Sequence, residues 1–276
     1  FLIGSSSCTK CKAGTYSQTL AASDAATCLT CPAFSFSLEA SSSRLQCLCD
    51  AGYTGPDGGP CAICAPGSYK EGAGMFPCTS CPAATYSGLT GALFLANCTA
   101  CPADSSSLAG SNDETDCVCK PGFSGPLGGP CAICEAGSWC KAGSTYFCPL
   151  NSFAPTGSGA QSDCACVAGY FGLNGGVCKP CLADTYCPGG NTSFACPADT
   201  LAAPGGEAKS DCTCKPTTSG TAGGPCTPCP AGSFCPGGTT TAVTCPPNTN
   251  SAGNSDGIND CKCIAGCVDP NPTRST

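Results

Sequence analysis

The sequence predicts a small disulfide-rich fold, irregular with short β-hairpins, arranged as an elongated tandem-repeat rod. Three observations predict it. Cysteine supplies 33 of 276 residues, a density typical of disulfide scaffolds. The cysteine spacings recur five times along the chain. Only 11% of the residues are charged and 7% are aromatic, so we expect cross-links to replace a single large apolar core.

Each repeat opens with a CxxC pair, and a single aromatic residue follows it. The predicted repeats cover residues 8–60, 61–130 with an inserted half-repeat, 131–177, 178–225 and 226–267, followed by a tail at 268–276. The aromatic residues are Tyr16, Tyr69, Trp139, Tyr186 and Phe234. We expect each of them to form the small core of its repeat, although a ligand-binding stripe is the alternative.

A loop of constant length follows in every repeat. It runs from a cysteine before proline to the first cysteine of a CxC, sixteen positions later: Cys31 to Cys47, Cys101 to Cys117, Cys148 to Cys164, Cys196 to Cys212 and Cys245 to Cys261. The proline fixes φ and favours an extended entry or a turn. The loop then continues through Ser, Thr, Asn and Gly, which predicts turns and no long helix.

Paired glycines precede four of the opening cysteines. They are Gly58-Gly59, Gly128-Gly129, Gly175-Gly176 and Gly223-Gly224. Because glycine accepts positive φ, these pairs predict hairpin turns between successive repeats. We therefore expect a linear stack in which each repeat contacts only its neighbours.

The segment CPAGSFCPGGTTTAVTCPPNTNSAGNSDGINDCKC, from Cys229 to Cys263, resembles the ephrin-receptor-type cysteine-rich repeat. A CxC followed by Gly-Tyr and a later cysteine also resembles the ending of an epidermal-growth-factor-like module. Similar repeats occur in animal receptor ectodomains and in algal and protist surface proteins, including those that build the flagellar hairs called mastigonemes. The resemblance implies an extracellular module.

This resemblance implies a bridge from the second cysteine of each CxC to the cysteine twelve positions later. The implied pairs are Cys49 with Cys61, Cys119 with Cys131, Cys166 with Cys178 and Cys214 with Cys226. In the fifth repeat that position is Ser275, so Cys263 is expected to pair with Cys267. Cys8 is left over, and its partner would lie upstream of Phe1 in a longer array. The remaining connectivity stays open.

Two cysteine chemistries compete with disulfides. Cys8/Cys11 and Cys28/Cys31 have the spacing of a structural zinc site, and Cys81 to Cys101 repeats it,. Later repeats lack the second CxxC, however, and every repeat adds a CxC, which argues against zinc. A redox role for CxxC would need a βαβ scaffold and a lowered thiol pKa, and no βαβ pattern is present.

Catalysis, metal binding and nucleic-acid binding have little support. The chain contains no histidine, which removes the usual general base, and we expect no catalytic residue, no cofactor and no metal. The acidic clusters Asp113-Glu114 with Asp116 and Asp256 with Asp260 could hold Ca²⁺, but neither matches an EF-hand. A net charge of −7 disfavours nucleic acid,, and no apolar run is long enough to span a membrane.

Two asparagines lie in glycosylation sequons, Asn191-Thr192-Ser193 and Asn97-Cys98-Thr99,. Asn191 is the better acceptor, because Cys98 is expected to be bridged. We expect an extracellular structural subunit of a filament, appendage or cell coat, mastigoneme-like and glycosylated, with other protein subunits as partners. The alternative is a receptor or adhesin ectodomain, with the insertion at 67–98 as its binding surface.

Overall fold

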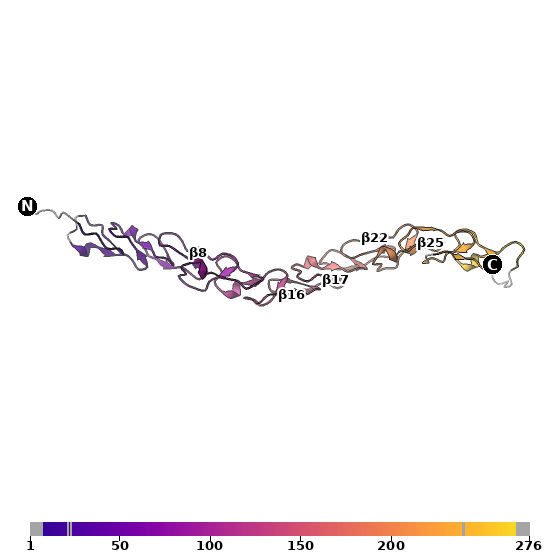
Figure 1. Ribbon diagram of the computed structural model, residues 1–276, viewed down its shortest axis with the longest axis horizontal. Coiled ribbons are helices and arrows are strands. Elements are labelled where there is room, and N and C mark those ends of the chain that lie inside the picture. Colours follow the sequence, from indigo (N-terminus) through magenta and orange to yellow (C-terminus); the bar gives the residue numbers. More distant parts are fainter. Residues whose placement is uncertain (1–7, 21, 23, 239–240, 269–276) are drawn as a thin grey trace, which may run out of the picture. The chain divides into compact units, whose positions relative to one another are not determined.

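Secondary structure is confined to short pieces, because cysteine, glycine or proline interrupts almost every run of residues. The computed structural model describes residues 8–20, 22, 24–238 and 241–268. Within these residues, thirty strands pair into fifteen two-stranded sheets, and the only helices are seven 3-10 turns of three residues. Figure 1 shows hairpin following hairpin, with no long helix. The predicted disulfide-rich fold of short hairpins in tandem repeats is confirmed.

One kind of hairpin, the opening hairpin, starts at the aromatic residue after each CxxC. A glycine with positive φ, such as Gly67 at 81°, turns the chain into the first strand. In the second repeat, Tyr69 lies opposite Thr79. The opening hairpins are β1 (Thr15–Tyr16) with β2 (Leu29–Thr30), β7 (Ser68–Tyr69) with β8 (Thr79–Ser80), β9 (Thr85–Tyr86) with β10 (Thr99–Ala100), β15 (Ser138–Lys141) with β16 (Ser144–Phe147), β21 (Thr185–Tyr186) with β22 (Phe194–Ala195), and β27 (Ser233–Phe234) with β28 (Val243–Thr244).

A second kind, the loop hairpin, lies in the constant loop of each repeat. The carbonyl oxygen of Pro32 accepts the backbone N–H of Ser35 at 3.2 Å and its hydroxyl at 2.7 Å, which forms the predicted turn after proline. The loop hairpins are β3 (Ser35–Phe36) with β4 (Leu48–Cys49), β11 (Ser105–Ser106) with β12 (Val118–Cys119), β17 (Ser152–Phe153) with β18 (Ala165–Cys166), β23 (Thr200–Leu201) with β24 (Thr213–Cys214), and β29 (Thr249–Asn250) with β30 (Lys262–Cys263).

A 3-10 turn precedes a cysteine in each constant loop and in two of the opening hairpins. The turns are η1 (Ala25–Thr27), η2 (Arg44–Gln46), η3 (Leu95–Asn97), η4 (Glu114–Asp116), η5 (Gln161–Asp163), η6 (Lys209–Asp211) and η7 (Ile258–Asp260). In six of them the last residue carries a side-chain oxygen that accepts backbone N–H groups at the start of the same turn. This contact satisfies donors that a short helix would otherwise leave unpaired.

The third kind, the junction hairpin, connects one repeat to the next. Seven of the eight paired glycines before the opening cysteines have positive φ as predicted, for example Gly58 at 83° and Gly59 at 72°, whereas Gly176 does not. The junction hairpins are β5 (Tyr53–Thr54) with β6 (Ala62–Ile63), β13 (Phe123–Ser124) with β14 (Ala132–Ile133), β19 (Tyr170–Phe171) with β20 (Lys179–Pro180), and β25 (Thr218–Gly220) with β26 (Cys226–Pro228).

The chain divides into two compact units, which are residues 1–133 with 141–144, and residues 134–140 with 145–276. In the first unit, the backbone N–H of Gly52 donates to the carbonyl of Lys70 at 2.9 Å, which joins the first repeat to the second. In the second unit, Gly169 donates in the same way to Cys187 at 2.9 Å. Neighbouring repeats within each unit are therefore linked by hydrogen bonds as well as by disulfides.

The core consists of cystine, and the expectation of an aromatic core is wrong. The largest fully buried side chains are all cysteines, including Cys47, Cys64 and Cys117. Tyr16, Tyr69, Trp139, Tyr186 and Phe234 are each only half-buried. Each repeat is too thin to enclose a ring, so the compact sulfur pairs fill its interior and the ring lies along its surface. Trp139, for example, stacks on Tyr146 with the ring centroids 4.4 Å apart.

Candidate functional site

The junction between repeats is the structural feature that the chain builds most regularly. At each junction, the second cysteine of the CxC forms a disulfide with the cysteine twelve residues later. The four pairs are Cys49–Cys61, Cys119–Cys131, Cys166–Cys178 and Cys214–Cys226. These are the four pairs that the resemblance implies. Their Cα atoms lie 5.6 to 5.8 Å apart, which is ordinary disulfide geometry.

A glycine inside each junction allows the bridge to form. A Cβ atom on Gly55 would lie 2.2 Å from the carbonyl oxygen of Pro60 and 3.3 Å from the sulfur of Cys49. Gly125 has the same surroundings, with the carbonyl oxygen of Pro130 at 2.3 Å. Any side chain at these positions would separate the two strands, so the glycine is required by the close approach of backbone to backbone.

The bridges inside the repeats follow two patterns. All five constant loops are closed by a bridge between their end cysteines: Cys31–Cys47, Cys101–Cys117, Cys148–Cys164, Cys196–Cys212 and Cys245–Cys261. In the opening hairpins, the second cysteine of CxxC bridges a residue 14 to 17 positions away in the early pairs Cys11–Cys28, Cys64–Cys78 and Cys81–Cys98. The later pairs span six positions instead: Cys134–Cys140, Cys181–Cys187 and Cys229–Cys235.

Three cysteines among the described residues remain free, namely Cys8, Cys263 and Cys267. The expected bridge from Cys263 to Cys267 is therefore wrong. Cys263 occupies the position of Cys49, whose sulfur lies inside its junction, beside Gly55. Cys267 occupies the position of Tyr53, whose ring instead stacks on Phe34 with the centroids 4.3 Å apart. Side chains at these two positions point to different surroundings, so two cysteines placed there do not meet.

The cysteines of the zinc alternative are occupied by disulfides. Cys11 is bridged to Cys28, and Cys31 is bridged to Cys47. Zinc binds thiolates, and these sulfurs have no free valence. In the part of the chain that the structure describes, no three His, Cys, Asp or Glu side chains gather closely enough to hold a metal ion.

The acidic clusters cap turns. The carboxylate of Asp116 accepts the backbone N–H groups of Asn112 and Asp113 at 3.0 and 3.1 Å. Asp260 accepts those of Asp256 and Gly257 at 3.1 and 3.2 Å. These oxygens already have donors, and they lie in the position at which Gln46 performs the same task in the first repeat. Turn capping thus accounts for the two clusters that suggested calcium.

The two sequon asparagines have different surroundings. Asn191 is exposed in a turn of the second unit, where the hydroxyl of Thr192 contacts the carbonyl of Gly189 at 3.5 Å. Asn97 is half-buried at the end of η3, and its side-chain oxygen accepts the N–H groups of Leu93 and Phe94. The Asn97 amide is therefore a turn cap, whereas the Asn191 amide is available.

Sequence reasoning missed Lys70, a buried charge in the inserted segment. It is 4% exposed, and its ammonium donates to the carbonyl oxygens of Cys49 at 3.4 Å, Tyr53 at 2.6 Å and Gly74 at 2.5 Å. Burial lowers the pKa of Lys70, and the negative charges of Asp50 and Asp57 oppose that shift. An alignment of the repeats contains a signal, because Lys70 stands where later repeats have Cys140, Cys187 and Cys235.

A shallow depression lies beside this lysine. It has a volume of about 320 Å³ and is lined by Tyr69, Lys70, Glu71, Phe76 and Thr79 with their neighbours. The three hydrogen bonds of the ammonium use all its donors, so the charge supports the loop and has none left for a ligand. The depression is a concave feature of the insertion.

No protein-family model matches the chain, and no curated protein matches it significantly. Among the described residues, no helix has the length and apolar character needed to cross a membrane. Fifteen disulfides within those residues are typical of a protein made for an oxidising compartment, as secreted proteins are,.

Proposed function

We propose that this chain is an extracellular structural subunit of a filament, appendage or cell coat, built from disulfide-stapled repeats and glycosylated. Mastigoneme-like assembly is the most specific form of the proposal. The resemblance described above supports it, and so does a repetitive architecture in which the buried groups serve to close turns and join repeats.

The observation that carries the proposal is a set of strongly exposed aliphatic side chains in the second and third repeats. Leu108 is 83% exposed, Leu150 is 85% exposed and Leu173 is 78% exposed. Isolated exposed leucines are ordinary, but here they recur along a chain in which only 11% of residues are charged. Covering these side chains with another protein chain would remove apolar area from water, which favours association.

Electron microscopy of native material under non-reducing conditions tests this function. Filaments or sheets are expected. Replacing Leu108, Leu150 and Leu173 together with glutamate should abolish lateral assembly, because each contact would then require burying a carboxylate. Thr156→Glu, at an exposed polar position, is the matched control and should assemble normally. Wild-type protein that remains monodisperse at every concentration would contradict the proposal.

A receptor or adhesin ectodomain is the second candidate function, and the depression in the insertion favours it. Phe76 lines that depression and is largely exposed, as expected for a residue that contacts a protein ligand. Under this function the chain would stay monomeric. Loss of cell-surface binding in Phe76→Ser, but not in a Leu150→Ser control, would support it.

A further inference from the structure

We propose that two copies of this chain join head to tail through a junction of the kind that links its own repeats. In this junction, Cys263 of one copy bridges Cys8 of the next, and residues 267–268 pair with residues 9–10 as a junction hairpin. The inference rests on the proposed structural function and specifies how subunits connect.

The first observation is that two of the three free cysteines among the described residues, Cys8 and Cys263, each occupy one half of the junction bridge. Cys8 opens the first CxxC, as Cys61 opens the second. Cys263 ends the last CxC, as Cys49 ends the first. Cys49 and Cys61 are bridged, whereas Cys263 and Cys8 are both free thiols. The two missing halves are complementary.

The second observation concerns the backbone. In the first junction, Tyr53–Thr54 pairs with Ala62–Ile63. The equivalent residues after Cys263 are Cys267–Val268, and the equivalent residues after Cys8 are Thr9–Lys10. Neither dipeptide belongs to a strand. Val268 is 89% exposed, and Thr9 and Lys10 are exposed. Unpaired strand edges are templates for pairing with another chain.

A third observation is that the two ends of the described chain carry an unpaired backbone donor and an unpaired backbone acceptor, at the positions that are hydrogen-bonded in the internal junctions. Within the chain, the N–H of Cys64 donates to the carbonyl of Gly52 at 2.8 Å, and Cys181 donates to Gly169 at 2.8 Å. The equivalent pair is the N–H of Cys11 and the carbonyl of Gly266. Neither group has a hydrogen-bond partner in the described residues, so both are available to a second copy.

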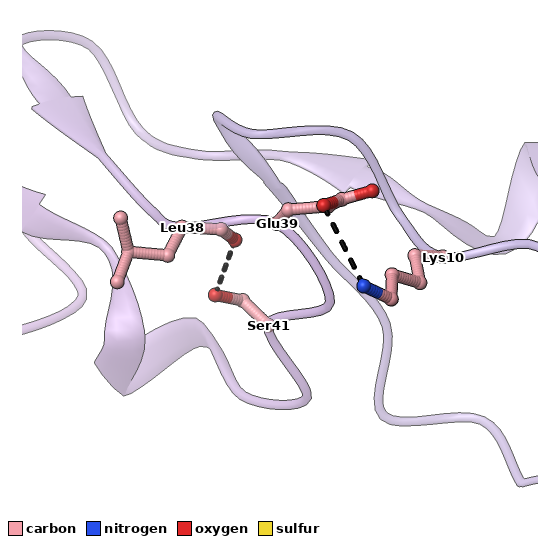
Figure 2. A network of polar contacts seen from close by, with 4 residues as sticks. All are labelled: Lys10, Leu38, Glu39 and Ser41. Carbon is pink, nitrogen blue, oxygen red and sulfur yellow. Dashed lines mark hydrogen bonds and ion pairs between the residues drawn. The ribbon is translucent and has the colours of Figure 1, made fainter.

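The side chain of Lys10 does not obstruct this edge. Figure 2 shows it turned toward Glu39, with its ammonium 3.7 Å from the carboxylate, beside the turn in which the hydroxyl of Ser41 donates to the carbonyl of Leu38 at 2.8 Å. Both charged groups are well exposed, so the contact contributes little energy. In this position the ammonium lies in solvent, clear of the backbone edge that the proposed pairing uses.

Closing the bridge is a two-electron oxidation, and a small-molecule disulfide such as glutathione disulfide serves as the oxidant. The thiolate of Cys263 attacks that disulfide, forming a mixed disulfide and releasing one small thiol. The thiolate of Cys8 from the second copy then attacks the sulfur of Cys263 and releases the other small thiol. Two protein thiols are oxidised, one disulfide is reduced to two thiols, and the two protons pass to the released thiols.

The test treats the purified, oxidised chain with glutathione disulfide and separates the products on a non-reducing gel. A ladder of multiples is expected, with a cross-linked peptide joining Cys8 to Cys263 in mass spectrometry. Cys8→Ser alone and Cys263→Ser alone should each give no ladder. An equal mixture of these two variants should give a dimer and nothing larger, since it holds one head thiol and one tail thiol. Cys267→Ser is the matched control and should form the full ladder.

Proline variants test the strand pairing separately from the thiols. Pro180 takes the position of Lys10 in its own junction, so Lys10→Pro should couple normally. Thr9→Pro removes the N–H expected to pair with residue 268, and coupling should slow roughly two- to tenfold, the value of one backbone hydrogen bond. Equal rates for the two proline variants would overturn the strand pairing.

The outcomes separate this junction from the function on which it rests. Filaments in the microscope without any Cys8–Cys263 peptide would overturn the junction and leave the structural function standing. A bridge from Cys8 or Cys263 to any other cysteine, as an upstream partner for Cys8 would give, would also overturn it. Free thiols together with a monodisperse monomer would overturn both proposals.

Discussion

The ammonium of Lys70 donates to the carbonyl oxygen of Tyr53 at 2.6 Å, and this contact ties the inserted segment to the junction strand β5. The same ammonium donates to the carbonyl of Gly74 at 2.5 Å, and Gly74 lies within the loop that the Cys64–Cys78 disulfide closes. A buried lysine is tolerated only where its donors are satisfied. Here a charge with three hydrogen bonds stands where the later repeats have the second cysteine of their short disulfide.

Lys70→Met should therefore destabilise the insertion. Methionine keeps the apolar stem but leaves the carbonyls of Tyr53 and Gly74 without their charged donor, at a cost of about 1–3 kcal/mol. Amide hydrogen exchange at Gly52 and Gly74 should become faster, while exchange in the second unit stays unchanged. Lys141→Met, at an exposed position, is the control. Unchanged exchange in Lys70→Met would show that the hydrogen bonds do not support the loop.

Gly125→Ala should open the junction between the second and third repeats. The added Cβ would lie 2.3 Å from the carbonyl of Pro130, and φ at this position is +159°. We expect a loss of roughly 1–3 kcal/mol in local stability from this overpacking and faster proteolysis between residues 119 and 131. Gly72→Ala, which would have no atom within 4 Å of its Cβ, is the control and should resist protease like the wild type.

Removing one junction bridge should loosen a single junction. The double variant Cys166→Ser, Cys178→Ser should lose about 2–5 kcal/mol locally, as for native disulfides in small secreted domains. Hydrogen exchange should rise around β19 and β20 and stay unchanged in the first unit, because the other bridges remain. Global unfolding of the chain would contradict the view that each repeat depends mainly on its neighbours.

Acid should weaken the η6 turn before the η3 turn. Hydrogen bonds from the backbone N–H groups of Ala208 and Glu207 hold the pKa of Asp211 below its ordinary value of 3.8. Its stabilising effect is thus fully present above pH 3.8 and is lost as the pH falls through the lowered folded-state pKa,. Asn97 makes the same contacts with a neutral amide, so its turn has no such transition.

Backbone NMR spectra recorded from about pH 6 down to about pH 2 would measure this difference. The amide signals of Ala208 and Glu207 should move together at acid pH, while those of Leu93 and Phe94 stay in place. Asp211→Asn should remove the transition at η6. A transition of equal size at Leu93 would show that general acid unfolding, and not the capping carboxylate, is responsible.

Asn191 should carry an N-glycan in protein from a eukaryotic secretory pathway, and Asn97 should not. Asn191 is exposed, whereas the Asn97 side chain is held at a turn cap beside the bridged Cys98. Intact-mass measurement before and after glycosidase treatment gives the result. Ser193→Ala should lower the mass by one glycan, and Thr99→Ala should leave the glycan mass unchanged,. A glycan at Asn97 would show that its turn forms after modification or opens easily.

The amino-acid sequence by itself determined the repeat, the constant loops and most of the glycine turns, because a covalent framework leaves its spacing in the chain. The junction pairs such as Cys49–Cys61 were implied by the resemblance to epidermal-growth-factor-like modules. Tertiary structure decided the rest. A disulfide requires two cysteines whose Cβ atoms approach and face each other, which spacing alone does not report. Only the packing shows that Cys263 and Cys267 do not meet, that Asn97 caps a turn, and that the ammonium of Lys70 is surrounded by carbonyl oxygens.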